Sequence, residues 1–193
     1  MKEHVCPWWL GYLLASPLRR FAHDPRKILA PYVHEGMTVL EPGPAMGFFT
    51  LDLARLVGPT GRVVAVDVGA KMIERLQRRA TKAGLATRVD ARLVQSDSMG
   101  LDDMAGKVHF TLAFFVVHEF SSAADFFAQA FAASKPGATL LLAEPVGHVG
   151  QHLWDAELQA ALDAGFELTG TPAIRRSRAA LLRAAARPAA VNS

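Results

Sequence analysis

The sequence predicts an α/β fold in which helices cover both faces of a mostly parallel sheet. From Thr38 onward, short apolar runs typical of strands alternate with longer segments of helical spacing. The run at 62–67 is almost entirely valine and alanine, as expected for a strand buried on both faces. With 193 residues, 51% of them hydrophobic, the chain can form one domain with a sizeable core.

The expected elements follow one another in a regular order along the chain. Strands are expected at 39–41, 62–67, 89–95, 108–117 and 139–143, and two short strands near 166–171 and 178–184. Helices are expected at 47–57, 70–83 and 151–164, and one more follows Ser122. Ser122 and Asp125 have the spacing of a capping box, which marks the start of that helix.

The most informative stretch is 37–50, which reads Met-Thr-Val-Leu-Glu-Pro-Gly-Pro-Ala-Met-Gly-Phe-Phe-Thr. A short apolar run leads to Glu41, and a turn with small residues at Gly43, Ala45 and Gly47 follows. Small residues let the backbone pass close to a ligand, and the N-terminus of a following helix presents free N–H groups. A carboxylate just before such a turn suits a ligand with a cationic or hydroxyl-rich part.

The spacing of the glycines separates two kinds of nucleotide-binding turn. The dinucleotide fingerprint G-x-G-x-x-G would need its third glycine at Phe48, which disfavours a dehydrogenase. The run Val-Leu-Glu-x-Gly-x-Ala-x-Gly instead resembles the first motif, D/E-x-G-x-G-x-G, of class I S-adenosylmethionine-dependent methyltransferases. Its context, with Val-Val-Ala-Val-Asp at 63–67, is similar to the branch that includes the ubiquinone and menaquinone biosynthesis methyltransferases. Ala45 departs from the motif, and its Cβ is costly if the backbone there needs a positive φ.

The resemblance covers about 35–183 and implies a Rossmann-like, doubly wound sheet of seven mostly parallel strands, with the last strand antiparallel. It divides the chain into an N-terminal helical arm or lid at 1–34, a methyltransferase domain at 35–186 and a loose tail at 187–193. In similar enzymes an N-terminal segment covers the active site, a role that the apolar and aromatic residues of the arm would suit.

The resemblance also implies S-adenosyl-L-methionine as cofactor, bound beyond the carboxyl ends of the strands. Asp67 would accept hydrogen bonds from the ribose hydroxyls, although an acid there could instead cap the next helix. Asp97 would accept a hydrogen bond from the adenine amino group, although Ser-Asp-Ser alone indicates only a turn. The expected cofactor-binding residues are Glu41, Gly43, Ala45, Gly47, Asp67, Val68, Met72, Ser96, Asp97, Ser98, Phe114 and Phe115.

Histidines and carboxylates gather where the fourth and fifth strands are expected to end. His118 and Glu119 close the fourth strand, Glu144 closes the fifth, and His148 and His152 follow at four-residue steps. A histidine near its unperturbed pKa of about 6.5 can take a proton from a hydroxyl, a thiol or an activated carbon. His118, Glu119, Glu144 and His148 are the expected catalytic residues. The alternatives are a zinc or iron site, although no metal is expected, or a strand cap without chemistry.

The acceptor is expected to be a small or lipophilic molecule, because no large insertion for a macromolecule is visible. The fourth strand also lacks the Asn/Asp-Pro-Pro-Tyr/Phe motif of relatives that methylate amino groups of nucleic acids or proteins. Two alternatives stay open. An arginine-rich stretch at 175–187 suits an RNA methyltransferase, and Ala45 suits a non-catalytic module that binds S-adenosylmethionine or S-adenosylhomocysteine.

Three features bear on location and assembly. The single cysteine, Cys6, excludes an intrachain disulfide and favours a cytoplasmic protein. No apolar run reaches the length that crosses a bilayer, so no stable membrane span is expected. The apolar N-terminal arm could also contribute to a homodimer contact.

Overall fold

The computed structural model describes residues 23–186, which form seven strands, five helices and three short 3₁₀ turns. The strands are β1 (Thr38–Pro42), β2 (Arg62–Asp67), β3 (Val89–Leu93), β4 (Val108–Phe114), β5 (Ser134–Pro145), β6 (Phe166–Gly170) and β7 (Ser177–Ala184). The helices are α2 (Pro25–Leu29), α3 (Thr50–Leu56), α4 (Ala70–Lys82), α5 (Ala123–Ala133) and α6 (Gln151–Asp163). The 3₁₀ turns are η2 (Ala86–Arg88), η3 (Asp102–Met104) and η4 (Val117–Glu119).

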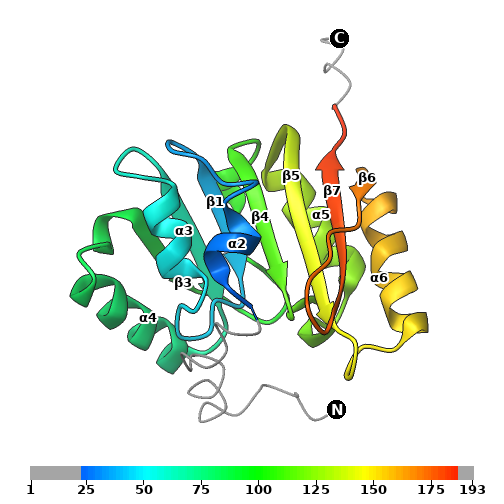
Figure 1. The fold of residues 1–193 in the computed structure, drawn as a ribbon, viewed down its shortest axis with the longest axis horizontal. Coiled ribbons are helices and arrows are strands. Elements are labelled where there is room, and N and C mark those ends of the chain that lie inside the picture. Colours follow the sequence, from blue (N-terminus) through cyan, green and yellow to red (C-terminus); the bar gives the residue numbers. More distant parts are fainter. Residues whose placement is uncertain (1–22, 187–193) are drawn as a thin grey trace.

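The strands form a single sheet in the order β3-β2-β1-β4-β5-β7-β6 (Figure 1). β1 to β5 pair in parallel, and β7 lies antiparallel between β5 and β6. The chain starts at β1 in the middle, moves outward to β3, and then returns to β4 on the other side of β1. The predicted doubly wound, mostly parallel sheet with an antiparallel last strand is therefore confirmed.

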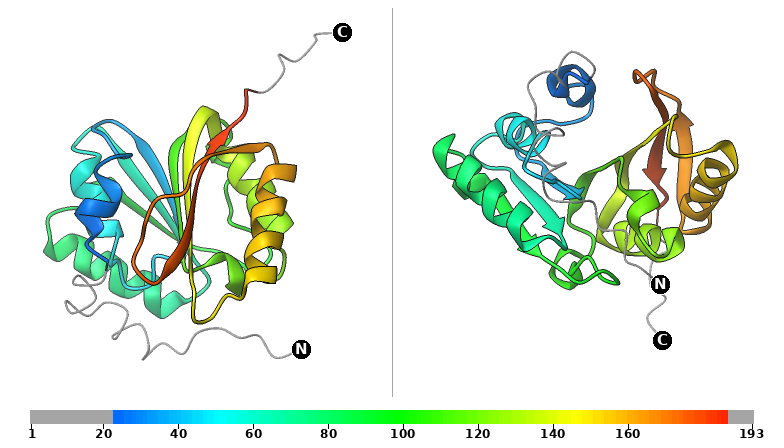
Figure 2. Two further views of the ribbon diagram at one scale, coloured as in Figure 1. Left: turned by 45° about the vertical axis from the view of Figure 1, so that its right-hand side comes forward. Right: turned by 90° about the horizontal axis from the view of Figure 1, so that it is seen from below.

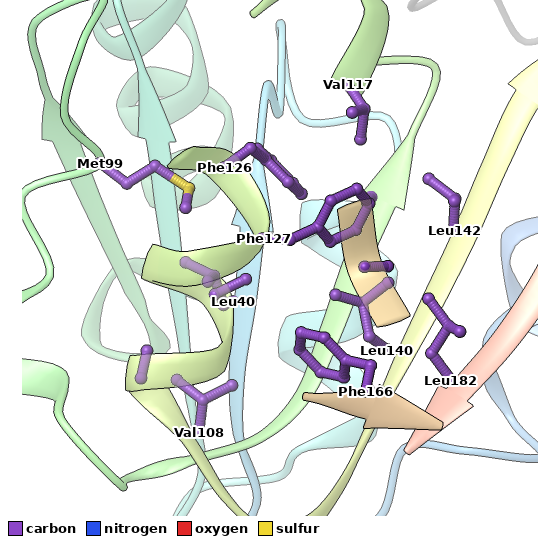
Figure 3. Close-up of a cluster of buried hydrophobic side chains, with 14 of the residues drawn as sticks. Leu40, Met99, Val108, Val117, Phe126, Phe127, Leu140, Leu142, Phe166 and Leu182 are labelled. Atoms are coloured by element: carbon purple, nitrogen blue, oxygen red, sulfur yellow. The ribbon is translucent and has the colours of Figure 1, made fainter. Parts of the chain in front are cut away.

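Two hydrophobic clusters cover the two faces of the sheet. Alternate residues of one strand point to opposite faces, so Val39 belongs to the cluster under α2 and α3, and Leu40 to the cluster under α5 and α6. Figure 2 shows α2 and α3 on the opposite side of the sheet from α5. In the cluster under α5 and α6, Phe127 of α5 lies near Leu140 of β5, and Phe126 lies beside Phe127 (Figure 3). This double burial explains why the central strands read as nearly continuous apolar runs.

Some element boundaries differ from those predicted. α3 begins at Thr50, three residues after the glycine turn, and β5 begins at Ser134, directly after α5. β4 ends at Phe114, because Phe115 has a φ of 59° and turns the chain out of the extended conformation. The predicted start of α5 is confirmed, since the backbone N–H of Asp125 donates to Ser122 Oγ at 3.1 Å.

Most of the predicted N-terminal arm at 1–34 and the whole predicted tail at 187–193 lie outside the described residues. Within the described part of the arm, Asp24 caps α2 by accepting the N–H of Arg26 at 3.1 Å. His23 is buried against the rings of Phe114 and Phe115, at centroid distances of 5.3 and 5.4 Å. Between residues 23 and 186, none of the helices has both the length and the apolar character needed to traverse a bilayer.

Candidate active site

The turn after β1 passes very close to two neighbouring elements. Gly43 and Gly47 have φ values of 63° and 80°, which favour glycine. A Cβ on Gly43 would lie 2.5 Å from Val116 Cγ2, and a Cβ on Gly47 would lie 2.6 Å from Leu76 Cδ1. The N–H of Gly43 also donates to the carbonyl of Val66 in β2 at 2.9 Å. The two glycines are therefore needed both for backbone conformation and for space.

Ala45, the residue that departs from the motif, has a φ of 49°. Its backbone thus has the positive φ at which a Cβ is costly. A left-handed backbone costs a non-glycine residue about 1–2 kcal/mol. The turn keeps the shape of a glycine turn although its middle residue is alanine.

We expect Ala45→Gly to raise the free energy of unfolding by about 0.5–1 kcal/mol. The substitution removes the strain, and the greater freedom of glycine in the unfolded chain offsets part of the gain. Urea denaturation measures the change. Ala156→Gly, at an exposed position inside α6, is the control and should lower stability by about 1 kcal/mol. A less stable Ala45→Gly variant would mean that contacts of the Ala45 methyl group outweigh the strain.

Glu41 is a buried carboxylate at the end of β1. It is 3% exposed, and its Oε2 has no hydrogen-bond partner within residues 23–186. Burial raises the pKa of Glu41 to about 8; the Thr50 hydroxyl nearby opposes this shift, and the negative charge of Asp67 adds to it. An ionised carboxylate in such surroundings is strongly disfavoured unless a cation or a hydrogen-bond donor compensates it. The arrangement suits a ligand that brings a positive group to this end of β1.

Asp67, at the end of β2, connects the glycine turn to the start of α4. Its Oδ1 accepts the N–H of Gly69 at 2.7 Å. Burial raises the pKa of Asp67, whereas hydrogen bonds from the N–H groups of Gly69 and Ala45 lower it. Asp67 does not cap α4, because Gly69 precedes the helix and no side chain caps it; the Asp67 carboxylate instead stabilises the turn between β2 and α4. Beside it, Val68 is 44% exposed and Met72 is half-buried, whereas Ile73 lies on the buried face of α4.

The Ser96, Asp97 and Ser98 triplet forms an exposed turn beyond β3. Gln129 of α5 holds this turn in place, accepting the N–H of Met99 at 2.8 Å and donating to the carbonyl of Asp97 at 3.5 Å. Met99 itself is fully buried in the hydrophobic core (Figure 3), so its role is packing. The three exposed residues lie at the same edge of the sheet as Asp67, because β2 and β3 are parallel neighbours.

His118 and Glu119 do not close β4, as the sequence predicted, but lie on η4, a 3₁₀ turn that begins three residues after the strand. The cause is the positive φ of Phe115, which ends the strand early. Phe114 is packed beneath Phe115, with ring centroids 4.4 Å apart. The turn therefore directs η4 toward the end of β5 rather than further along β4.

His118 and Glu144 form a hydrogen-bonded pair that joins η4 to β5. His118 Nδ1 donates to Glu144 Oε2 at 2.6 Å, and the N–H of Val117 donates to Glu144 Oε1 at 2.9 Å. Glu144 is fully buried. Burial disfavours the imidazolium of His118, but the hydrogen bond and the charges of Glu144, Glu119 and Glu157 outweigh it and raise the pKa of His118. The pair fixes the histidine tautomer and leaves Nε2 as the nitrogen that can accept a proton.

The structure brings two further predicted residues to this pair. The ring of His148 meets that of His118 edge-on, at a centroid distance of 4.9 Å. Burial, together with the charges of Asp67 and Glu144, raises the pKa of Glu119. The negative charges of both carboxylates, at the ends of β2 and β5, therefore act on this residue. His152 is exposed on α6 and makes no such contact. In the part of the chain that the structure describes, no three histidine, cysteine or acidic side chains are arranged to hold a metal ion.

Glu157 in α6 is 1% exposed and was not among the residues predicted from the sequence. The charge of Glu157 acts on His118, and the charge of Glu144 acts on Glu157. A signal existed, because Trp154, Glu157, Leu158 and Ala161 have the i, i+3, i+4, i+7 spacing of a buried helix face. An acid at such a position indicates an unusual environment.

The acidic groups lie on opposite faces of the sheet. Glu41 shares the face of Val39, toward α3, whereas Glu144 shares the face of Leu142, toward α5 and α6. The candidate active site thus has a cluster around Glu41 and Asp67 and a second cluster around His118 and Glu144.

Comparison with known proteins identifies the family to which this architecture belongs. A family model described as a methyltransferase domain matches residues 33–178, which include every predicted site residue. A SAM-dependent methyltransferase from Aquifex aeolicus is 24% identical, with a TM-score of 0.81 over 93% of this chain and 98% of that one. No protein of curated function matches the sequence significantly.

Two more distant structures share the fold. A putative rRNA-methylase from Clostridium thermocellum is 19% identical, with a TM-score of 0.64 over 83% of this chain and 95% of that one. A putative methyltransferase in complex with the Trm112 methyltransferase activator of Haloferax volcanii is 16% identical, with a TM-score of 0.70 over 92% of this chain and 96% of the other. At these identities the likeness shows the fold alone. The family match, which spans most of the sequence, shows that the chain belongs to the methyltransferase-domain family.

Proposed function

We propose that the protein is an S-adenosylmethionine-dependent methyltransferase that acts on a small or lipophilic acceptor. The observation that carries this proposal is the buried Glu41 carboxylate, whose Oε2 has no partner within the described residues, beside a turn that adopts glycine conformations. A cationic amino acid moiety attached to a nucleoside supplies what this site lacks. The charge compensates Glu41, and the nucleoside hydroxyls match the acid at the end of β2.

The cofactor would be held by the ends of four strands. Glu41 and the turn from Gly43 to Gly47 would bind the methionine part, and Asp67 would accept the ribose hydroxyls, with Val68 and Met72 beside it. Ser96, Asp97 and Ser98 would bind the adenine, and Phe114 and Phe115 would lie at the methyl end. When bound, the cofactor supplies an electrophilic methyl group on a sulfonium.

On the acceptor side, His118 would act as general base. Its Nε2 takes the proton of the attacking hydroxyl, thiol or activated carbon, while Nδ1 keeps its hydrogen bond to Glu144. His148 packs against the imidazole and limits its rotation. Glu119, on which the charges of Asp67 and Glu144 both act, would contact the acceptor. The ubiquinone/menaquinone branch, a cytoplasmic location and a homodimer belong to this proposal as further expectations.

A second candidate, an RNA methyltransferase, is favoured by Arg175 and Arg176, which are exposed on the loop before β7. The carbonyl of Arg175 accepts a hydrogen bond from His23 Nε2 at 2.9 Å, and the His23 ring lies against Phe114 and Phe115, which connects this loop to the expected methyl end of the site. RNA binding that weakens steeply with rising salt would support this candidate, and binding that is absent or insensitive to salt would exclude it.

We expect Asp67→Ala to weaken the binding of S-adenosylhomocysteine about 10- to 100-fold, the effect of removing a charged hydrogen-bond acceptor. Isothermal titration of the full chain measures the affinity. Asp163→Ala, at the exposed end of α6, is the control and should bind as the unchanged protein does. Absence of binding in the unchanged protein would refute the proposed function. Binding without methyl transfer to any acceptor tested would identify the non-catalytic module instead.

A further inference from the structure

The outer side of α4 carries a row of basic side chains that the proposed reaction does not use. Lys71, Arg75, Arg78 and Lys82 follow one another at steps of four, three and four residues, so they lie on one side of the helix. Lys71, Arg78 and Lys82 are exposed, and Arg75 is half-buried. These four residues form the basic face of α4, which extends about 16 Å along the helix axis.

The basic face points away from the sheet. The buried residues of α4, which are Ile73, Leu76 and Ala80, lie on the opposite side of the helix. α4 packs against β2 and β3, and β3 is the end strand of the sheet (Figure 1). The basic face therefore lies at the margin of the molecule, where a large partner can reach it.

The local structure of α4 does not account for this concentration of positive charge. Within α4, Glu74 is the one acidic residue, and its carboxylate pairs with Arg78 at 2.6 Å. Lys82 is in the last turn, where the helix dipole favours a cation, but Lys71 is in the first turn, where the dipole disfavours one. Lys71 also precedes Arg75 by four residues, a spacing at which like charges repel. Cations that weaken their own helix indicate an anionic partner outside it.

Two exposed apolar side chains lie beside the start of α4. Leu93, the last residue of β3, is 58% exposed, and Val68, which follows β2, is 44% exposed. Leu93 is the register partner of Asp67, so Leu93 and Val68 lie at neighbouring strand ends. Exposed apolar residues beside several cations are typical of surfaces that bind lipid bilayers, because the cations attract anionic headgroups and the apolar side chains enter the layer beneath them.

RNA is the other polyanion that a row of cations can attract. Binding of single-stranded RNA usually combines cations with aromatic side chains on which the bases stack, and no residue of α4 is aromatic. The apolar residues at the start of the helix would gain nothing from phosphates. The composition of this surface therefore favours lipid over RNA.

We propose that the basic face of α4, with Leu93 beside it, docks on an anionic lipid surface. The acidic headgroups compensate the charges of the four basic residues, and the Leu93 side chain enters the boundary between headgroups and acyl chains. α4 lies along the surface without crossing it. This docking goes beyond the proposed function and requires neither cofactor nor acceptor.

The test is sedimentation of the full chain with phosphatidylcholine vesicles that contain about 30% phosphatidylglycerol, at low salt and at about 0.5 M NaCl. We expect binding at low salt and release at high salt, because salt screens the attraction. The variant Lys71→Gln/Arg78→Gln/Lys82→Gln should bind about 100-fold less tightly, since each cation near an anionic surface contributes about fivefold. Leu93→Gln should weaken binding about tenfold through the loss of apolar contact.

The matched control is Lys107→Gln/Lys135→Gln/Arg183→Gln. It removes the same charge from three exposed positions outside α4, so it should bind nearly as tightly as the unchanged protein. Urea denaturation shows that each variant is folded. S-adenosylhomocysteine binding, measured on the same samples, tests the proposed function separately, and the α4 variant should retain it.

Four results would overturn the inference. They are a full chain that does not bind the anionic vesicles at low salt, an α4 variant that binds as the unchanged protein does, and an equal loss in the α4 variant and the control, which would be an effect of net charge alone. The fourth is a short single-stranded RNA that binds the basic face while the vesicles do not, which would identify the partner as a nucleic acid. Unchanged binding by Leu93→Gln would overturn the apolar contact.

Discussion

Glu41→Gln should stabilise the ligand-free protein and abolish most of its affinity for S-adenosylhomocysteine. Glutamine keeps the shape of the side chain but removes a carboxylate that is buried without a partner for its Oε2 among residues 23–186. The affinity should fall about 10- to 100-fold, because the ligand loses a charged hydrogen-bond acceptor. Opposite changes in stability and affinity are the signature of a residue kept for binding.

The same substitution should change how stability depends on pH. The pKa of Glu41 rises from 4.5 to about 8 on folding, so between these values the folded protein binds the proton more tightly than the unfolded chain. The free energy of unfolding therefore falls as pH rises from about 4.5 through about 8, by up to about 3 kcal/mol at pH 7. Glu41→Gln should remove this decline.

Urea denaturation between pH 5 and 9 measures the effect, and Glu35→Gln serves as control. Glu35 is exposed on the loop before β1, so its removal should leave the pH profile unchanged. If Glu41→Gln instead lowers stability at pH 8, the carboxylate has a compensating partner and the argument for a cationic ligand fails.

Gly43→Ala should destabilise the protein by about 2–4 kcal/mol. A positive φ of 63° accounts for about 1–2 kcal/mol of this loss. The remainder is overpacking, because the new Cβ would lie 2.5 Å from Val116 Cγ2 and valine has few rotamers with which to move away. The free energy of unfolding in urea measures the loss.

Gly147→Ala is the matched control for this substitution. Gly147 follows β5, and a Cβ built there would have nothing within 4 Å, so the change should stay within about 0.5 kcal/mol of zero. Combining Gly43→Ala with Val116→Ala should restore part of the stability, as a favourable coupling in a double-mutant cycle. Two strictly additive effects would mean that the clash is relieved by movement of the turn instead.

The sequence predicted the fold well where local chemistry determines the structure. Strands buried on both faces read as apolar runs, and the spacing of small residues after β1 indicated the turn that the structure shows. The early end of β4 was not predictable in the same way, because Phe115 gives no local indication of a positive φ. The strain at Ala45 depends on its φ angle, which the residue type alone does not determine.

The candidate site was predictable to a similar extent. Residues at the ends of strands could be assembled from topology alone, since parallel strands end at one edge. Glu157 lies in the middle of a helix, and its relation to His118 depends on how α6 is placed by packing against α5 and β6. The periodicity of the sequence could not predict contacts between elements that are distant along the chain.

The placement of Glu41 and Glu144 on opposite faces of the sheet has an evolutionary consequence. Under the proposed function, substitutions around His118 and Glu144 can change the acceptor without altering Glu41 and Asp67, whereas Gln129 of α5 must stay because it holds the turn proposed to bind the adenine. Proteins that descend from one ancestor could then differ in their acceptor while keeping the proposed mode of binding the methyl donor.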